Sequence, residues 1–205
     1  MPAAMNTMEH HPDLRRLILD TTRRMLTEVG FRNLSMRRIA REIGYSATTI
    51  YLYFESKQEL VYALIDEGAQ RLFDLTVEAG RPHAAAPRTR LEKACQTYIE
   101  FGLANPEYYE IMYLLHPDQM GRYPTDKYRR ARRNILYLRD CLVQLEQEGR
   151  LTLTDPLASA TAVWASLHGT VSLILARRVD KSVDVDVLIS ASIQSILAQS
   201  PSLHR

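Results

Sequence analysis

The chain of 205 residues contains only two cysteines, Cys95 and Cys141, and they lie far apart. Two widely spaced cysteines argue against a disulfide framework and indicate a reducing compartment. A membrane-spanning helix needs about 18 consecutive apolar residues, and no stretch of the sequence comes close to that length. Residues 1–14 also lack the basic region and apolar run of a signal peptide. We therefore expect a cytoplasmic protein that does not enter a membrane.

The chain also lacks a large net charge and the residue patterns typical of metal sites and catalytic sites. The formal net charge is +2, which is too small to identify a polyanionic partner, so any argument for one must rest on the local distribution of charge. No group of His, Cys, Asp and Glu has the spacing of metal ligands. No Ser-His-Asp order, glycine-rich phosphate loop or carboxylate pair stands out either. We expect no metal, no cofactor and no catalytic activity.

Signals for β-strands are nearly absent, whereas helical periodicity, interrupted by proline, glycine and asparagine, runs along the chain. The pattern predicts an all-α protein of about nine helices. The first helix should stop at Gly30, and a loop should occupy residues 116–125, "HPDQMGRYPT". The predicted helices span residues 13–29, 36–43, 47–54, 56 or 57 to 79, 87–104, 107–115, 125–148, 156–179 and 184 or 186 to 199.

Two short helices joined by about three residues around Gly44 form the pattern of a helix-turn-helix. Ser35 and Ser46 stand where they would cap the two helices. The apolar sides consist of Ile39, Ala40 and Ile43 on the first helix and Ala47, Ile50 and Phe54 on the second. The outer sides carry Arg37, Arg38, Arg41, Thr48, Thr49, Tyr51, Leu52 and Tyr53. Hydroxyls, phenols and arginines suit phosphate oxygens and base edges; the alternative is a solvated helical hairpin whose tyrosines border the core.

The segment "LSMRRIAREIGYSATTIYLYFESKQEL", preceded by a helix ending in "LTEVGF", resembles the DNA-binding region of TetR-family transcriptional regulators. The resemblance covers about residues 14–64 and rests on the pattern G-x-S-x-x-x-[IL]-Y-x-[YH]-F-x-x-K. Tyr45 departs from the family, which usually has a small aliphatic residue in the turn. The resemblance implies a three-helix DNA-binding domain at residues 10–56 and a larger helical ligand-sensing and dimerisation domain at residues 57–200.

The same resemblance implies roles for individual residues on double-stranded operator DNA. Ser35, Tyr53 and Lys57 would bind phosphates, and Ala47 would make apolar contact. Ser46 belongs to the same surface. The residues expected in the major groove are Arg37, Thr48, Thr49 and Tyr51.

The second half of the chain resembles the C-terminal domain type named for its Trp-His-Gly motif, matched here by Trp164, His168 and Gly169. In such regulators this domain senses a small molecule. A mostly apolar pocket between helices is expected, and the alternative is that its aromatic and sulfur side chains form the core. The candidate ligand residues are Tyr98, Phe101, Tyr109, Met112, Tyr113, Trp164 and His168.

A homodimer is expected to form through the last two long helices. Small residues on the first of them permit close approach of a second helix, and the last helix adds an apolar stripe. Together with their symmetry mates they would form a four-helix bundle with an isologous interface. The predicted interface residues are Ala158, Ala162, Ala165, Gly169, Leu188, Ile189, Ile193 and Ile196.

The sequence thus predicts a homodimeric repressor that binds a palindromic operator and is released by a small, largely apolar ligand. Three alternatives stay open: a helical enzyme with a hydrophobic substrate, a protein-binding adapter with a degenerate DNA module, and an activator in place of a repressor. The basic run at Arg129, Arg130, Arg132 and Arg133 is a second candidate for DNA contact, although its spacing around a helix favours a solvated face or ion pairs with acidic neighbours.

Overall fold

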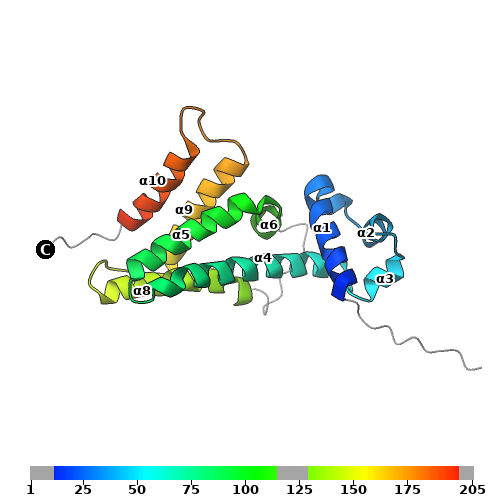
Figure 1. Cartoon of the computed structure of the whole chain (residues 1–205), viewed down its shortest axis with the longest axis horizontal. Coiled ribbons are helices and arrows are strands. Elements are labelled where there is room, and N and C mark those ends of the chain that lie inside the picture. Colours follow the sequence, from blue (N-terminus) through cyan, green and yellow to red (C-terminus); the bar gives the residue numbers. More distant parts are fainter. Residues whose placement is uncertain (1–11, 115–128, 199–205) are drawn as a thin grey trace, which may run out of the picture. The chain divides into compact units, whose positions relative to one another are not determined.

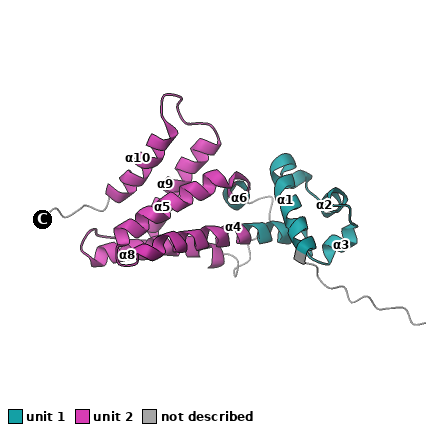
Figure 2. Ribbon diagram, in the orientation of Figure 1, with its two compact units in different colours: residues 1–65, 110–123 teal, residues 66–109, 124–205 magenta. Residues whose placement is uncertain are grey.

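The computed structural model describes residues 12–114 and 129–198, and every regular element in these two ranges is a helix. The predicted all-α fold is confirmed. Two compact units can be distinguished, residues 1–65 with 110–123 and residues 66–109 with 124–205 (Figure 2). The long helix α4, Lys57–Gly80, contributes to both. The predicted domain boundary at residue 57 stays a prediction, while the contacts divide the units at residue 65.

The first unit is built on α1 (Pro12–Asn33), α2 (Met36–Glu42), α3 (Ala47–Tyr51) and the start of α4 (Figure 1). Gly30 interrupts α1 with φ 73° and ψ 165°, so the predicted stop is correct, but one further turn follows it. At the start of α4 the Ser56 hydroxyl accepts from Glu59 N at 3.1 Å, and Glu59 Oε2 accepts from Glu55 N. These two bonds, of which the second goes to Glu55 and not to the capping residue Ser56, fix where α4 begins.

The second unit packs α5 (Pro87–Ala104) against α8 (Arg133–Gln147), α9 (Pro156–Leu175) and α10 (Val185–Ala198). The short turn η1, Arg81–His83, connects α4 to α5, and α6, Pro106–Tyr109, follows α5. At Gly102 of α5 a Cβ atom would lie 2.7 Å from Val171 Cγ1 and 3.0 Å from Tyr109 Cδ2. Only glycine therefore allows α5 and α9 to approach so closely.

Several predicted boundaries shift. The predicted helix 107–115 begins at Pro106 and passes at Glu110 into a π-helical turn, η2 (Glu110–Leu114). The predicted helix 156–179 ends at Leu175, because Arg177 adopts φ 53° and Arg178 N turns back to Leu173 O at 2.9 Å. Of the predicted helix 125–148, α8 covers the part from Arg133 onward. The predicted loop at residues 116–125 lies outside the described ranges.

By length and composition alone, α9 is apolar enough to cross a membrane, although it contains no run of 18 consecutive apolar residues. It contains an 18-residue window with a mean hydropathy of 1.3, of which 28% is buried. The sequence estimate counted uninterrupted apolar runs, whereas alanine, serine, threonine and glycine interrupt this helix without adding charge. Core helices of other proteins pass the same test, so this property alone assigns no membrane segment.

Candidate DNA-binding surface and sensor core

Hydrogen bonds set the geometry between α2 and α3. The Ser35 hydroxyl accepts from Arg38 N at 3.2 Å, and the Ser46 hydroxyl accepts from Thr49 N at 3.1 Å. Gly44 takes φ +76° while Tyr45 N donates to Ala40 O at 2.9 Å. A left-handed residue after a helix satisfies its last carbonyls and reverses the chain. The predicted caps and turn are therefore present.

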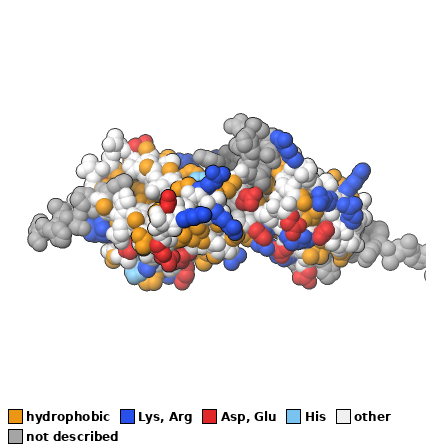
Figure 3. Space-filling view, turned by 90° about the horizontal axis from the view of Figure 1, so that it is seen from above, with side chains coloured by type: hydrophobic (Ala, Val, Ile, Leu, Met, Phe, Trp, Pro, Cys, Tyr) orange, Lys and Arg blue, Asp and Glu red, His pale blue; other side chains and the backbone are white. Residues whose placement is uncertain are grey.

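The α2–α3 pair buries the side predicted to be apolar. Ile39, Ala40, Ile50 and Phe54 are buried, and Ile43 is half-buried. The candidate DNA-contacting side chains divide by exposure. Ser35, Arg37, Ser46, Thr48 and Tyr51 are exposed, while Ala47, Thr49, Tyr53 and Lys57 are half-buried. Arginine and lysine side chains gather at the end of the first unit that carries α2 and α3 (Figure 3).

Tyr45 lies beside this surface, and sequence reasoning did not include it among the candidate contacts. Its side chain is 48% exposed, close to the 52% of Tyr51. It directly precedes the Ser46 cap of α3, so it stands at the N-terminal end of the helix expected to read bases. A large aromatic residue in the turn was the signal in the sequence.

Lys57 has a partner within the first unit. Its Nζ donates to the carbonyl of Phe31 at 2.9 Å and lies 3.9 Å from the centroid of the Phe31 ring. Burial lowers the pKa of the Lys57 ammonium from its ordinary value. The phosphate contact implied by the family resemblance stays a prediction for this residue.

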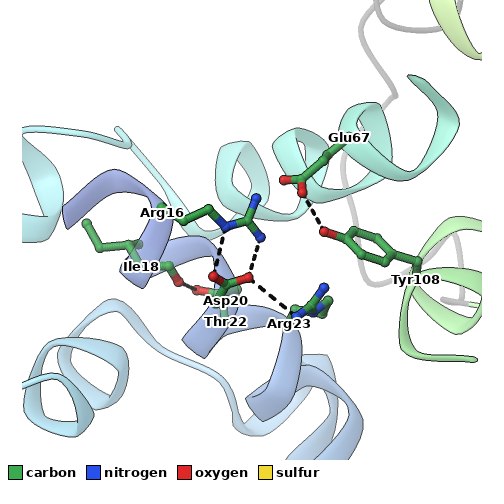
Figure 4. A network of polar contacts seen from close by, with 7 residues as sticks. All are labelled: Arg16, Ile18, Asp20, Thr22, Arg23, Glu67 and Tyr108. Atoms are coloured by element: carbon green, nitrogen blue, oxygen red, sulfur yellow. Dashed lines mark hydrogen bonds and ion pairs between the residues drawn. The ribbon is translucent and has the colours of Figure 1, made fainter. Parts of the chain in front are cut away.

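Ion pairs stiffen α1, which supports the α2–α3 pair. Asp20 bonds to Arg16, with Nε and Oδ2 2.8 Å apart, and pairs with Arg23 at 3.4 Å (Figure 4). The hydrogen bond from Arg16 lowers the pKa of Asp20. Arg24 reaches Glu42 of α2 at 2.7 Å. These exposed pairs fix orientation more than they add stability.

In the second unit, four candidate ligand residues form one hydrogen-bonded cluster. Trp164 Nε1 donates to the Tyr98 hydroxyl at 3.0 Å, and that hydroxyl lies 3.4 Å from the Tyr109 hydroxyl. The Tyr109 hydroxyl lies 2.6 Å from His168 Nδ1, and the two rings stack at 5.5 Å. Burial lowers the pKa of His168 and raises that of Tyr109, so both are neutral near pH 7. The polar groups of these four side chains therefore hydrogen-bond to one another.

The other three candidate ligand residues lie elsewhere. Met112 and Tyr113 belong to η2 in the first unit. Phe101 is buried and lines an open groove of about 490 Å³ between α4 and α5. The groove is lined by Arg71, Leu75, Glu78, Ala79, Thr97, Glu100, Phe101, Ala104 and Asn105.

The predicted dimer residues divide between surface and core. On α9, Ala158, Ala162 and Ala165 are exposed and Gly169 is half-buried. On α10, Leu188 and Ile189 are half-buried. Ile193 and Ile196 are each only 5% exposed, because they pack into the core of their own chain. This burial within their own chain leaves the two side chains little surface for a partner, and the dimer interface as a whole stays a prediction.

Two residues of the basic run are engaged by α4. Arg130 pairs with Asp66 at 3.2 Å, while Arg133 bonds to Gln70 and lies over the Phe73 ring at 4.5 Å. Nearby, the Tyr108 hydroxyl donates to Glu67 at 2.5 Å (Figure 4). Ion pairing with acidic neighbours thus holds for Arg130. Whether Arg129 and Arg132, both exposed, contact DNA stays open.

Neither cysteine is activated. Cys95 and Cys141 are fully buried, and burial raises their pKa values to about 12 and about 11. The thiols are therefore poor nucleophiles near neutral pH. Among residues 12–114 and 129–198, no group of three or more His, Cys, Asp or Glu side chains has a metal-binding arrangement.

Family models match both parts of the chain. The model described as bacterial regulatory proteins of the tetR family matches residues 18–64, and the tetracyclin repressor-like C-terminal domain matches residues 91–196. This chain belongs to the TetR family. It is a transcriptional regulator and not an enzyme. The second match includes the Trp164, His168 and Gly169 motif.

Individual relatives are also named as transcriptional regulators. A helix-turn-helix-type transcriptional repressor of Mycobacterium tuberculosis is 34% identical over 97 residues, covering 42% of this chain and 52% of that protein. An uncharacterised regulator of Haemophilus influenzae is 38% identical over 63 residues, covering 31% and 32%. The chain thus matches between about a third and half of the length of these curated relatives.

Solved structures share the fold along nearly the whole chain. A Rhodococcus protein of unknown function has a TM-score of 0.79 at 23% identity, covering 96% of this chain and all of the other. A tetR-family regulatory protein, also from Rhodococcus, has a TM-score of 0.75 at 15% identity, covering 95% and 100%. At these identities the likeness concerns the fold alone.

Proposed function

We propose that this TetR-family regulator is a homodimeric repressor that binds a palindromic operator and is released by a small, largely apolar ligand. The observation that carries the proposal is the outer surface of α2 and α3, where Arg37, Thr48 and Tyr51 are exposed above a buried apolar side. A repressor is favoured over an activator by the relative from Mycobacterium tuberculosis, which is named a repressor.

The two capping serines suit phosphate contacts as well. In each, the hydroxyl oxygen accepts a backbone N–H bond. The Ser35 hydroxyl hydrogen can be donated to another acceptor, and the Ser46 hydroxyl also lies 2.9 Å from the Thr49 hydroxyl, so Ser46 can donate to a phosphate when Thr49 donates to Ser46. Phosphate oxygens accept such bonds and fix the register of a protein on the duplex. Ser35 and Ser46 would thus set the register, while Arg37, Thr48, Thr49 and Tyr51 read bases. We add Tyr45 to this set because it is exposed at the same end of α3.

Selection of bound fragments from a random duplex library tests the reading surface. We expect wild type to enrich two half-sites related by a two-fold axis, with centres about 34–36 Å apart or a multiple of that. Tyr51→Ala and Tyr45→Ala should each change the enriched bases, since each wrong contact shifts binding by about 1–3 kcal/mol. Tyr62→Phe, at a buried tyrosine of α4, is the control and should enrich the wild-type sequence. Unchanged enrichment in both alanine variants would remove these tyrosines from the reading surface.

The proposed dimer uses the outward side of α9. Ala158, Ala162 and Ala165 are small and exposed there, so a second helix can approach closely. On α10 we add Val187, which is 63% exposed, and the exposed Ala191 to the half-buried Leu188 and Ile189. An isologous contact of this kind would bring two copies of α3 to a palindrome.

The effector is proposed to act on the second unit, at the groove beside Phe101 or by entering the aromatic cluster. Leu75, Ala79, Phe101 and Ala104 give the groove apolar walls, which favours an apolar ligand. Tyr98, one turn before Phe101 on α5, accepts the hydrogen bond from Trp164. A ligand that displaces α5 side chains would therefore change the surroundings of the only tryptophan.

Fluorescence titration tests this sensor. In a panel of small aromatic and aliphatic compounds, the effector should change Trp164 emission saturably. Because linkage is reciprocal, its affinity should fall by about 5–150-fold when operator DNA is present. A compound with equal affinity in both titrations binds without being the signal. If no compound changed both emission and operator affinity, release by an apolar ligand would be refuted for the classes in the panel.

A further inference from the structure

The helix-turn-helix exposes large apolar side chains that the core of the first unit does not use. Tyr45, Tyr51 and Leu52 are 48%, 52% and 42% exposed. They are three of the ten large hydrophobic residues that are exposed within residues 12–114 and 129–198, and all three fall in residues 45–52. Exposed apolar side chains gathered in one place mark a contact surface. Since this surface is the one expected to meet DNA, its apolar groups need a partner on the duplex.

The segment from Gly44 to Phe54, "GYSATTIYLYF", contains no Asn, Gln, Asp, Glu, Lys or Arg. Base edges are distinguished most sharply by bidentate hydrogen bonds, which arginine or lysine makes to guanine and asparagine or glutamine makes to adenine. Hydroxyl groups bond to donors and acceptors alike, so Thr48 and Tyr51 distinguish bases poorly through their oxygens. Hydrogen bonds from α3 therefore supply little discrimination between bases.

Apolar contact remains as the means by which α3 can tell bases apart. The C5-methyl group of thymine is the apolar group that base pairs present in the major groove. Tyr51 and Leu52 follow Thr48 by three and four residues, which places them on one side of the helix. Thr48 brings a methyl group to that side and Tyr51 an aromatic ring. Tyr45 adds a second exposed ring in the turn directly before the Ser46 cap.

We propose that α3 recognises thymine methyl groups through Tyr45, Thr48 and Tyr51, so that each operator half-site is rich in thymine at the bases facing this helix. The inference rests on the proposed function, because it takes α3 as the reading helix, and it names the bases that this surface selects. Arg37 of α2 is an exposed cation. Its contact with guanine or with a phosphate would not depend on these methyl groups.

Replacing thymine by uracil removes the methyl group and leaves the base-pairing edge unchanged. We would take the duplex that wild type enriches from the random library and compare it with the same duplex carrying deoxyuridine at every thymine of both half-sites. Burial of one methyl group is worth about 4-fold in affinity, and a palindrome presents each position twice. Wild type should therefore bind the uracil duplex at least about 16-fold more weakly.

Coupling between protein and DNA identifies the side chains that read the methyl groups. Thr48→Ser removes only a methyl group, so it should weaken binding to the thymine duplex about 4- to 16-fold and binding to the uracil duplex much less. Tyr51→Ala should behave in the same way, whereas Tyr51→Phe keeps the ring and should retain the preference for thymine. Thr152→Ser, the same change at an exposed threonine of the second unit, should bind both duplexes as wild type does. Arg37→Ala should weaken binding to both by the same factor.

Equal affinity of wild type for the thymine and uracil duplexes would overturn the proposal. So would a loss that Thr48→Ser and Tyr51→Ala show equally on both duplexes, because the preference for thymine would then come from the shape of the DNA. Either result, obtained with an enriched palindrome, would leave the proposed function standing. A wild-type protein that enriched no sequence would refute the proposed function and this inference with it.

Discussion

Ala162→Arg is expected to yield a folded monomer that no longer recognises its operator. Ala162 is exposed on α9, so arginine disturbs no packing within the subunit. In the proposed four-helix bundle it would place a large cation opposite its own symmetry mate. Losing the second half-site reduces specific binding toward the nonspecific level, a loss of about 10³-fold or more. Sedimentation velocity and operator titration measure the two effects on one sample.

The same substitution at Ala84 is the matched control. This alanine is also exposed but lies between η1 and α5, and its variant should remain dimeric with wild-type affinity. A dimeric Ala162→Arg protein would place the interface outside the outer side of α9. A monomer with undiminished operator affinity would refute the requirement for two half-sites.

Ile193→Glu is expected to unfold the second unit and not merely to separate a dimer. Ile193 is 5% exposed in its own chain, so the new carboxylate would be buried. An uncompensated charge in a core costs several kcal/mol, which is comparable with the about 5–15 kcal/mol that stabilise a whole domain. Circular dichroism should show a loss of helix and a lower unfolding midpoint.

Gln194→Glu, one residue further along and exposed, carries the same new charge and should retain the wild-type helical content and midpoint. Comparing Ile193→Glu with Gln194→Glu separates the effect of burying a carboxylate from the effect of adding a negative charge. A well-folded, monomeric Ile193→Glu protein would contradict the core position of this side chain and would restore the original expectation that it belongs to the interface.

The sequence alone determined the local features of the reading surface. Ser35, Gly44 and Ser46 act through bonds that span three to five residues, so a short pattern is sufficient to specify them. The burial of Ile50 on α3 followed for the same reason. Phe54 is buried as predicted, although α3 ends at Tyr51 and not at residue 54. The TetR-family membership, carried by this segment, was also predictable.

Only the tertiary structure decided what each apolar or polar side chain meets. Periodicity shows that α10 has an apolar stripe, but Ile193 turned out to be covered by its own chain. The aromatic residues of the sensor region were predicted, yet the bonds from Trp164 to Tyr98 and from Tyr109 to His168 join residues 66 and 59 positions apart. Lys57 likewise meets a carbonyl 26 residues earlier. Such contacts depend on how helices pack against one another, and the pattern within one helix does not contain that information.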